Sequence, residues 1–248
     1  MRGIILLLLP LLSCFTYWAY RNNTIFGLKT ENTVPDSLYP SPSLVVSYHT
    51  KWAKNHYNER IIYFKKQPLS MYDIVFVGNS IIEQGGDWGM RFGNSNIKNR
   101  GISGDVTEGV LNRLGEICYI KPTAVFILCG INDLLAYKSA NFVVSNTLKI
   151  VKEINLQSHD TKVYIQTILP TDKKDLILKI KDINNQLKNK ANANNYSIID
   201  LHNLFAGSND LIKCDLTYDG THPNEAGYLK WVNCEKHILD TLINHPTK

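Results

Sequence analysis

The sequence lacks the motifs that identify several common enzyme and binding classes. Its Cys and His residues do not recur at the spacings of a zinc site, and neither a P-loop nor a G-x-G-x-x-G run is present. The lysines are scattered, and no repeat of basic and aromatic residues is found, which gives little support to nucleic-acid binding. We therefore expect no metal, no organic cofactor and no nucleic-acid partner.

The composition is that of a globular protein that can bury a core. The chain has 248 residues, of which 44% are hydrophobic and 20% charged, and its formal net charge is only +5. No repeats or low-complexity tracts interrupt it. A chain of this length forms one large domain, or one domain with appendages.

The first 20 residues differ from the rest and predict export or membrane attachment. A nearly continuous apolar run from residue 4 to residue 20 follows Arg2. Three targeting segments fit it: a secretory signal peptide, a lipoprotein signal in which Cys14 is lipidated, and an uncleaved membrane anchor. A buried core helix is the remaining alternative, which the charged and turn residues on both sides of the run disfavour. Residues 21–43 are polar and contain three prolines, so we expect a tether there. We therefore expect an extracytoplasmic protein that is membrane-tethered or secreted.

The number and spacing of the cysteines say little about disulfide pairing. If Cys14 belongs to the targeting segment, four cysteines remain, and Cys214 with Cys234 is the more plausible pair if a disulfide exists. Cys129 lies in an apolar run and is expected to be a buried thiol. Neither the disulfide state nor the oligomeric state follows from the sequence.

Beyond the tether, strand and helix patterns alternate regularly. Such alternation predicts an α/β protein in which a parallel sheet is covered by helices on both faces. Five strands suggest a flavodoxin-like three-layer α/β/α sandwich over residues 44–248. A helix over 48–66 precedes the sheet, with Trp52, Tyr57, Ile61 and Phe64 expected on its core-facing side. The expected strands are 74–77, 97–102, 123–129, 162–169 and 197–201.

The stretch MYDIVFVGNSIIEQ (residues 71–84) places a serine at the end of a buried strand. The apolar run ends at Gly78, and Ser80 follows two residues later, where open α/β sheets place their ligands. Ser80 is either a nucleophile or the cap of the next helix. No G-x-S-x-G surrounds it, which disfavours a classical α/β-hydrolase.

A nucleophilic serine needs a base, and His222 is the best candidate among seven histidines. Asp219 precedes it by three residues in a Gly- and Pro-bounded turn, so the carboxylate can accept a hydrogen bond from one imidazole nitrogen. The other nitrogen is then free to take the serine proton. His202, at the end of the last strand, is a competitor.

Two further strand ends offer hydrogen-bond donors for a developing oxyanion. Asn132 follows the strand over 123–129, and Gly104 follows the strand over 97–102. A glycine lets a backbone N–H approach a ligand without a side chain in the way. Taken singly, each residue also fits an ordinary cap or turn.

Together these blocks resemble the GDSL or SGNH hydrolases. Gly78-Asn79-Ser80-Ile81 is similar to the family's first block, with Asn79 in place of its usual Asp. Gly104, Gly130-x-Asn132-Asp133 and Asp219-x-x-His222 are similar to the remaining blocks, in the family's order. The resemblance implies a serine esterase with Ser80 as nucleophile, His222 as base and Asp219 as its orienter. It also implies an oxyanion hole of the Ser80 N–H, the Gly104 N–H and the Asn132 side chain.

The substrate is left open by the sequence. The pocket would be shaped by loops that include the segment 83–96, and we expect Asn79, Trp88 and Asp133 as substrate-pocket candidates. The tether argues for substrates outside the cell, and we expect a deacylase of extracytoplasmic glycans or small esters. The alternatives are a lysophospholipase or thioesterase acting on lipid esters and, more remotely, a non-catalytic carbohydrate-binding module.

Overall fold

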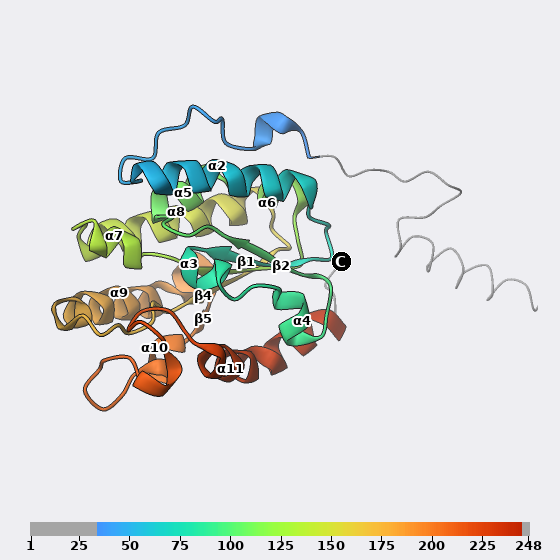
Figure 1. Cartoon of the computed structure of the whole chain (residues 1–248). Coiled ribbons are helices and arrows are strands. Elements are labelled where there is room, and N and C mark those ends of the chain that lie inside the picture. Colours follow the sequence, from blue (N-terminus) through green and yellow to red (C-terminus); the bar gives the residue numbers. More distant parts are fainter. Residues whose placement is uncertain (1–33, 245–248) are drawn as a thin grey trace, which may run out of the picture. The chain divides into compact units, whose positions relative to one another are not determined.

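The computed structural model describes residues 34–244, and its centre is a five-stranded parallel sheet with strand order β2-β1-β3-β4-β5 (Figure 1). The strands are β1 (Ile74–Gly78), β2 (Ile97–Gly101), β3 (Ala124–Leu128), β4 (Lys162–Gln166) and β5 (Ser197–Ile199). Every neighbouring pair is parallel. This order is that of a flavodoxin-like sheet, whose topological switch point lies between β1 and β3.

Helices cover both faces of the sheet (Figure 1). The short helix α4 (Trp88–Phe92) and the C-terminal helix α11 (Glu225–Asn244) pack together on one face. The other face carries α2 (Lys51–Lys66), α5 (Thr107–Asn112), α6 (Gly115–Ile120) and α8 (Ala140–Gln157), with α9 (Ile177–Lys190) packed against α8. The predicted three-layer α/β/α sandwich with a five-stranded parallel sheet is therefore confirmed.

The core explains why the strands are almost wholly apolar. All five residues of β1 and of β3 are buried, as expected for central strands covered on both faces. On the α11 side, the rings of Phe76, Phe126 and Tyr164 stack across three adjacent strands, with centroids 4.9 and 4.6 Å apart. Trp88 of α4 continues this stack over Phe76 at 4.6 Å.

Two sequence expectations about the N-terminal part of the domain are corrected. Residues 34–43 were assigned to a tether, but Val34 and Tyr39 are buried in the core. The expected core-facing stripe of α2 is right for Tyr57, Ile61 and Phe64. It is wrong for Trp52, which lies in the first turn of the helix and is 61% exposed.

The helix expected over 106–118 is also corrected, because the structure divides it into α5 and α6. Arg113 lies between the two helices, and its buried guanidinium donates to Asp105 and to the carbonyl oxygens of Arg100 and Gly78. Because Arg113 makes these contacts with the interior, the helix ends at Asn112 and a new one begins at Gly115.

The cysteines of the described part, Cys118, Cys129, Cys214 and Cys234, are all free, so the suggested pair Cys214–Cys234 is not joined here. Cys129 is buried, as expected, and burial raises the pKa of its thiol.

No helix within residues 34–244 has the length and apolar character needed to cross a membrane. The predicted signal or anchor over residues 1–20, with Cys14, lies outside the described residues.

Candidate active site

Ser80 opens the helix α3 (Ser80–Glu83) directly after β1. The preceding Asn79 has extended backbone angles and accepts a hydrogen bond from Ile81 N at 3.0 Å, so Asn79, not Ser80, caps this helix. The Ser80 side chain is therefore free for another partner. The residue is only 8% exposed, at the carboxyl edge of the sheet beside the switch point.

The partner of Ser80 is His222, which is 142 positions away in the sequence. Ser80 Oγ lies 2.8 Å from His222 Nε2, and His222 Nδ1 lies 2.7 Å from Asp219 Oδ2. The turn that holds the pair is fixed locally, because Asp219 Oδ1 accepts from the backbone N–H groups of Thr221 and His222 at 2.9 and 2.8 Å. A carboxylate at Nδ1 favours the tautomer in which Nε2 is free to accept the serine proton.

The electrostatics of Asp219 suit this arrangement. Partial burial opposes ionisation, but hydrogen bonds from His222 and from the Thr221 N–H outweigh it and hold the pKa of Asp219 below its usual range. The carboxylate is thus stabilised as the anion that faces the imidazole.

His202, the competing base, lies elsewhere. It is the second residue of the short helix α10 (Leu201–Phe205) after β5, where its backbone N–H donates to Thr167 Oγ1. Burial lowers its pKa, which Asp200 and Asp210 oppose. Within the described part of the chain, the hydroxyl of Ser80 bonds the imidazole of His222 and not that of His202.

Two loops bring the expected oxyanion donors to the same edge of the sheet. Gly104 follows β2 and has a φ of 79°, in the left-handed region that favours glycine. Asn132 lies in the first turn of α7 (Ile131–Leu135) after β3, and its Nδ2 donates to the carbonyl oxygen of Asp105 at 2.8 Å. The amide has a second N–H, which this contact leaves for another acceptor.

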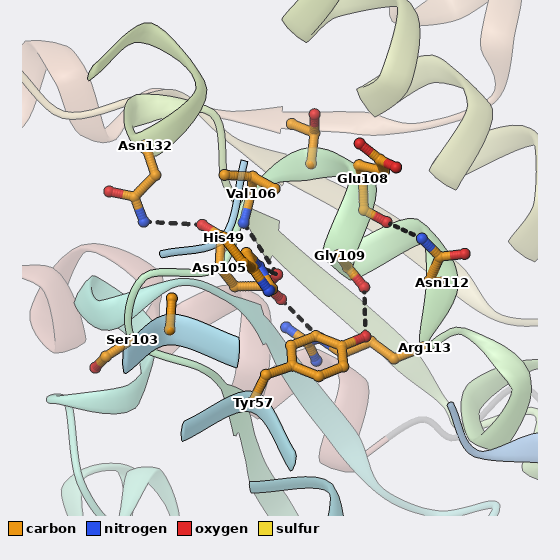
Figure 2. A network of polar contacts seen from close by, with 12 residues as sticks. His49, Tyr57, Ser103, Asp105, Val106, Glu108, Gly109, Asn112, Arg113 and Asn132 are labelled. Carbon is orange, nitrogen blue, oxygen red and sulfur yellow. Dashed lines mark hydrogen bonds and ion pairs between the residues drawn. The ribbon is translucent and has the colours of Figure 1, made fainter. Parts of the chain in front are cut away.

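A buried network holds the Gly104 loop in place (Figure 2). The Asp105 carboxylate is wholly buried and accepts from His49 Nε2 at 3.1 Å, from Arg113 Nε at 2.9 Å and from Val106 N at 3.0 Å. Figure 2 shows Asn132 reaching the same residue from the opposite side, at its main-chain oxygen. Asp105 therefore links the segment before α2, the residues that flank α5 and the first turn of α7 around the loop that carries Gly104.

A second carboxylate holds the other end of this loop. Glu83 of α3 accepts the backbone N–H of Ser103 and lies 2.9 Å from His56 Nε2 and 3.3 Å from Arg60 Nε. These contacts lower the pKa of Glu83 in spite of its burial. On one side of Gly104, Ser103 is thus bonded to the Glu83 carboxylate, which His56 holds, and on the other side Asp105 carries a carboxylate that His49 holds.

The three substrate-pocket candidates, Asn79, Trp88 and Asp133, are buried. Trp88 is 1% exposed, stacks on Phe76 and donates to the Ile82 carbonyl oxygen, so it belongs to the core. Asn79 and Asp133 are fully buried. Asp133 accepts from the Thr107 N–H and hydroxyl, and burial raises its pKa against these hydrogen bonds. The expectation that these residues line a pocket is corrected, because each is used to hold the framework.

Sequence reasoning missed the supporting residues His49, His56, Glu83, Asp105 and Arg113. Asp105 stood directly after Gly104, and Glu83 three residues after Ser80, which are the only local signals. The two histidines fall in a helical region with no recognisable motif, and their contacts span 56 and 27 positions.

Comparison with known proteins identifies the family of the chain. The model of the GDSL-like Lipase/Acylhydrolase family matches residues 76–230. None of the curated proteins compared with the sequence matches it.

Solved structures share the fold at low sequence identity. A protein from Streptococcus pneumonia has a TM-score of 0.69 at 23% identity, covering 76% of this chain and 94% of its own. A GDSL-like lipase from Bacteroides thetaiotaomicron gives 0.64 at 23% identity, with 76% and 97% covered. A carbohydrate esterase family 3 protein from Talaromyces cellulolyticus gives 0.54 at 19% identity, with 70% and 99% covered. With its family model matched over more than half its length, the chain belongs to the GDSL-like lipase/acylhydrolase family of carboxylic ester hydrolases.

Proposed function

We propose that the protein hydrolyses carboxylic esters through an acyl-enzyme on Ser80, and that its substrates are acylated glycans or small esters outside the cytoplasm. The observation that carries the proposal is the continuous chain from Ser80 Oγ through His222 to Asp219, with hydrogen bonds of 2.8 and 2.7 Å.

The mechanism follows from these contacts. Ser80 Oγ attacks the ester carbonyl carbon while His222 Nε2 takes its proton, and Asp219 stabilises the imidazolium that forms. The negative oxygen of the tetrahedral intermediate is stabilised by the N–H groups of Ser80 and Gly104 and by the free N–H of the Asn132 amide. His222 then protonates the leaving alkoxide, and water releases the acid in a second, equivalent cycle.

Each oxyanion donor is worth roughly 3–4 kcal/mol of barrier when it is correctly placed. The rigid support of Gly104 and Asn132 by Asp105 therefore has a direct catalytic use, because donors that are already aligned need no reorganisation during the reaction.

The extracytoplasmic location is supported by the apolar run over residues 4–20 and by the polar segment after it. Mass spectrometry of the mature N-terminus would decide among a cleaved signal, a lipidated Cys14 and a retained anchor. A mature chain that retains Met1 and is recovered from the cytoplasm would contradict this part of the proposal.

The first test is an ester panel measured on the wild type, Ser80→Ala, His222→Ala and His202→Ala. The panel contains p-nitrophenyl acetate, acetylated glycans and lysophospholipids. We expect Ser80→Ala and His222→Ala to lose at least roughly 10³-fold in kcat, because nucleophile and base act as a unit. His202→Ala is the matched histidine control and should retain activity.

Two results would overturn the assignment. Unchanged turnover of p-nitrophenyl acetate by Ser80→Ala would remove the nucleophile. A preference for long-chain lysophospholipids over acetylated glycans would replace the proposed substrate class with lipid esters.

A further inference from the structure

Two aromatic rings stand at the rim of the site with most of their surface in solvent. Trp52 and Tyr218 are 61% and 60% exposed. Exposed aromatic side chains are unremarkable when they are scattered singly. These two differ, because one lies against the oxyanion loop and the other against the base.

Trp52 borders the Gly104 loop. A Cβ built on Gly104 would lie 3.4 Å from Cζ3 of the indole. The indole stacks on the His56 imidazole, with centroids 5.0 Å apart and planes inclined by 13°. His56 is held in turn by Glu83 at 2.9 Å. One face of the Trp52 ring is therefore supported from behind, and the exposed surface is presented in a defined orientation.

Tyr218 borders His222 in the same manner. The phenol ring stacks on the imidazole, with centroids 5.8 Å apart and planes inclined by 13°. Its hydroxyl lies 2.6 Å from Gln84 Oε1, to which it donates a hydrogen bond. The stacking on His222 and the hydrogen bond to Gln84 both restrict the Tyr218 side chain. Little side-chain entropy therefore remains to be lost when a ligand covers the ring.

The surroundings of the rings are polar. Gln84 and Asp219 are exposed beside Tyr218, and Ser103 and Asn132 are partly exposed around the oxyanion loop. A ligand that matches this surface needs a flat apolar face for the rings and hydroxyl groups for the polar neighbours. A pyranose has this combination, with C–H groups on its faces and hydroxyls on its edge. A long acyl chain could use the rings but would leave the polar groups without partners, which is unfavourable.

The chemistry of the reaction orients the ligand. His222 must protonate the leaving alkoxide, so the alcohol part of the ester has to lie beside Nε2 of this residue. Tyr218 stacks on that imidazole and therefore lies on the alcohol side of the scissile bond. Trp52 lies against the loop that carries Gly104.

We propose that Tyr218 and Trp52 are two sugar-binding positions of this site: Tyr218 stacks on the sugar that bears the ester, and Trp52 stacks on a neighbouring sugar of the same chain. This inference rests on the proposed function and specifies its substrate class as acylated oligosaccharides. Trp52 lies in α2, outside the residues 76–230 that the family model matches, so this position is additional to the matched domain.

The test compares kcat/KM on three substrates: p-nitrophenyl acetate, an acetylated monosaccharide and an acetylated oligosaccharide of the same sugar. Relative to its own activity on p-nitrophenyl acetate, Trp52→Ala should lose roughly tenfold or more on the oligosaccharide and little on the monosaccharide. Tyr218→Ala should lose selectivity for both sugars. Trp52→Phe and Tyr218→Phe keep a ring and should restore most of the loss.

Tyr119→Ala is the matched control, because Tyr119 is 53% exposed on α6. It lies close before β3 in the chain and thus toward the amino edge of the sheet, opposite the site. It should leave all three values unchanged.

Equal losses of Trp52→Ala on all three substrates would overturn the proposal, because they would mean that the ring only packs the oxyanion loop. Losses that are largest on a long-chain lysophospholipid, added as a fourth arm, would also overturn it in favour of an acyl-chain contact. Failure of the subsite is distinguishable from failure of the proposed function, since only the latter leaves Ser80→Ala active on p-nitrophenyl acetate.

Discussion

At the scale of single residues, Asp219 determines the state of the base. It bonds the imidazole of His222 at 2.7 Å and also accepts two backbone N–H groups of its own turn. The same carboxylate therefore orients the ring, selects its tautomer and fixes the backbone that carries it. No other residue of this turn can replace it.

Asp219→Asn should retain the fold and lose roughly 10³–10⁴-fold in kcat, because an amide can keep the geometry but favours the wrong tautomer of His222. The measurement is steady-state kinetics with p-nitrophenyl acetate. Asp215→Asn, an exposed carboxylate four positions earlier, is the matched control and should behave as the wild type. A similar loss in both variants would mean that the turn, not the carboxylate, was damaged.

The pH profile of kcat/KM should show a single acid limb. Protonation of His222 blocks acceptance of the serine proton, so activity falls as the pH decreases. Because the pKa of Asp219 is held below its usual range, this carboxylate should not add a second protonation to the acid limb. The logarithm of kcat/KM should therefore fall with a slope of one. A slope of two would show that a second protonation contributes to the loss.

At the scale of elements, α2 forms part of the site although it precedes the family-matched segment. Its Ala53 Cβ lies 3.0 Å from where a Cβ on Gly104 would be, so the helix packs directly on the oxyanion loop. His49, just before the helix, lies 3.1 Å from the Asp105 carboxylate, and Tyr57 donates to the Gly109 carbonyl oxygen at 2.9 Å (Figure 2). We infer that His49 is a positioning residue for Gly104 and Asn132.

His49→Ala should lower kcat for p-nitrophenyl acetate by roughly tenfold with little change in KM, since oxyanion donors act mainly on the transition state. The free energy of unfolding should fall by about 1–3 kcal/mol, because a buried hydrogen bond to a charged group is lost. His49→Gln, which keeps a donor, should recover part of kcat.

The control on the same element is Lys51→Ala, an exposed residue at the start of α2. It should change neither kcat nor stability. If His49→Ala lost stability with kcat unchanged, the histidine would be structural only.

At the scale of the whole molecule, one buried carboxyl group couples stability to pH. Glu235 of α11 is fully buried against β4, where Gln166 Nε2 donates to its Oε1 at 2.7 Å. Burial raises the pKa of Glu235 to about 8, although Gln166 and Trp231 oppose the shift. The folded protein thus holds a proton that the unfolded chain releases near its ordinary, lower pKa.

The sign of the effect follows from this difference in bound protons. Between the unfolded and folded pKa values the folded state binds more protons, so the free energy of unfolding falls as the pH rises. From pH 5 to pH 8 the contribution of Glu235 is a loss of up to about 4 kcal/mol. Glu235→Gln should remove it, because an amide can bond Gln166 without a proton to release. Urea unfolding at several pH values checks this, and parallel curves for wild type and variant would contradict it.

Much of the fold follows from local patterns in the sequence. The apolar runs that end at Gly78 and Gly130 predicted strands, and the alternation with helices predicted the parallel sheet, because such patterns reflect which faces are buried. The carboxyl ends of parallel strands share one edge, so Ser80, Gly104 and Asn132 could be expected at one site.

What the local patterns do not contain is packing between distant segments. Two histidines competed as the base, and only the folded chain places His222, 142 positions from Ser80, at 2.8 Å. Trp52 was expected in the core and Trp88 in the substrate pocket, yet Trp52 is exposed beside Gly104 and Trp88 lies in the core. The burial of Asp105 between α2, α5 and α7 likewise depends on three elements.

The sequence by itself therefore determined the order of strands and helices along the chain and the residue types at the strand ends. Both depend on interactions within a few residues, such as hydrophobic periodicity and turn formation. The tertiary structure alone decided which of those residues meet, and that α2 supports the oxyanion loop. Such contacts depend on how the layers pack, which no short segment specifies.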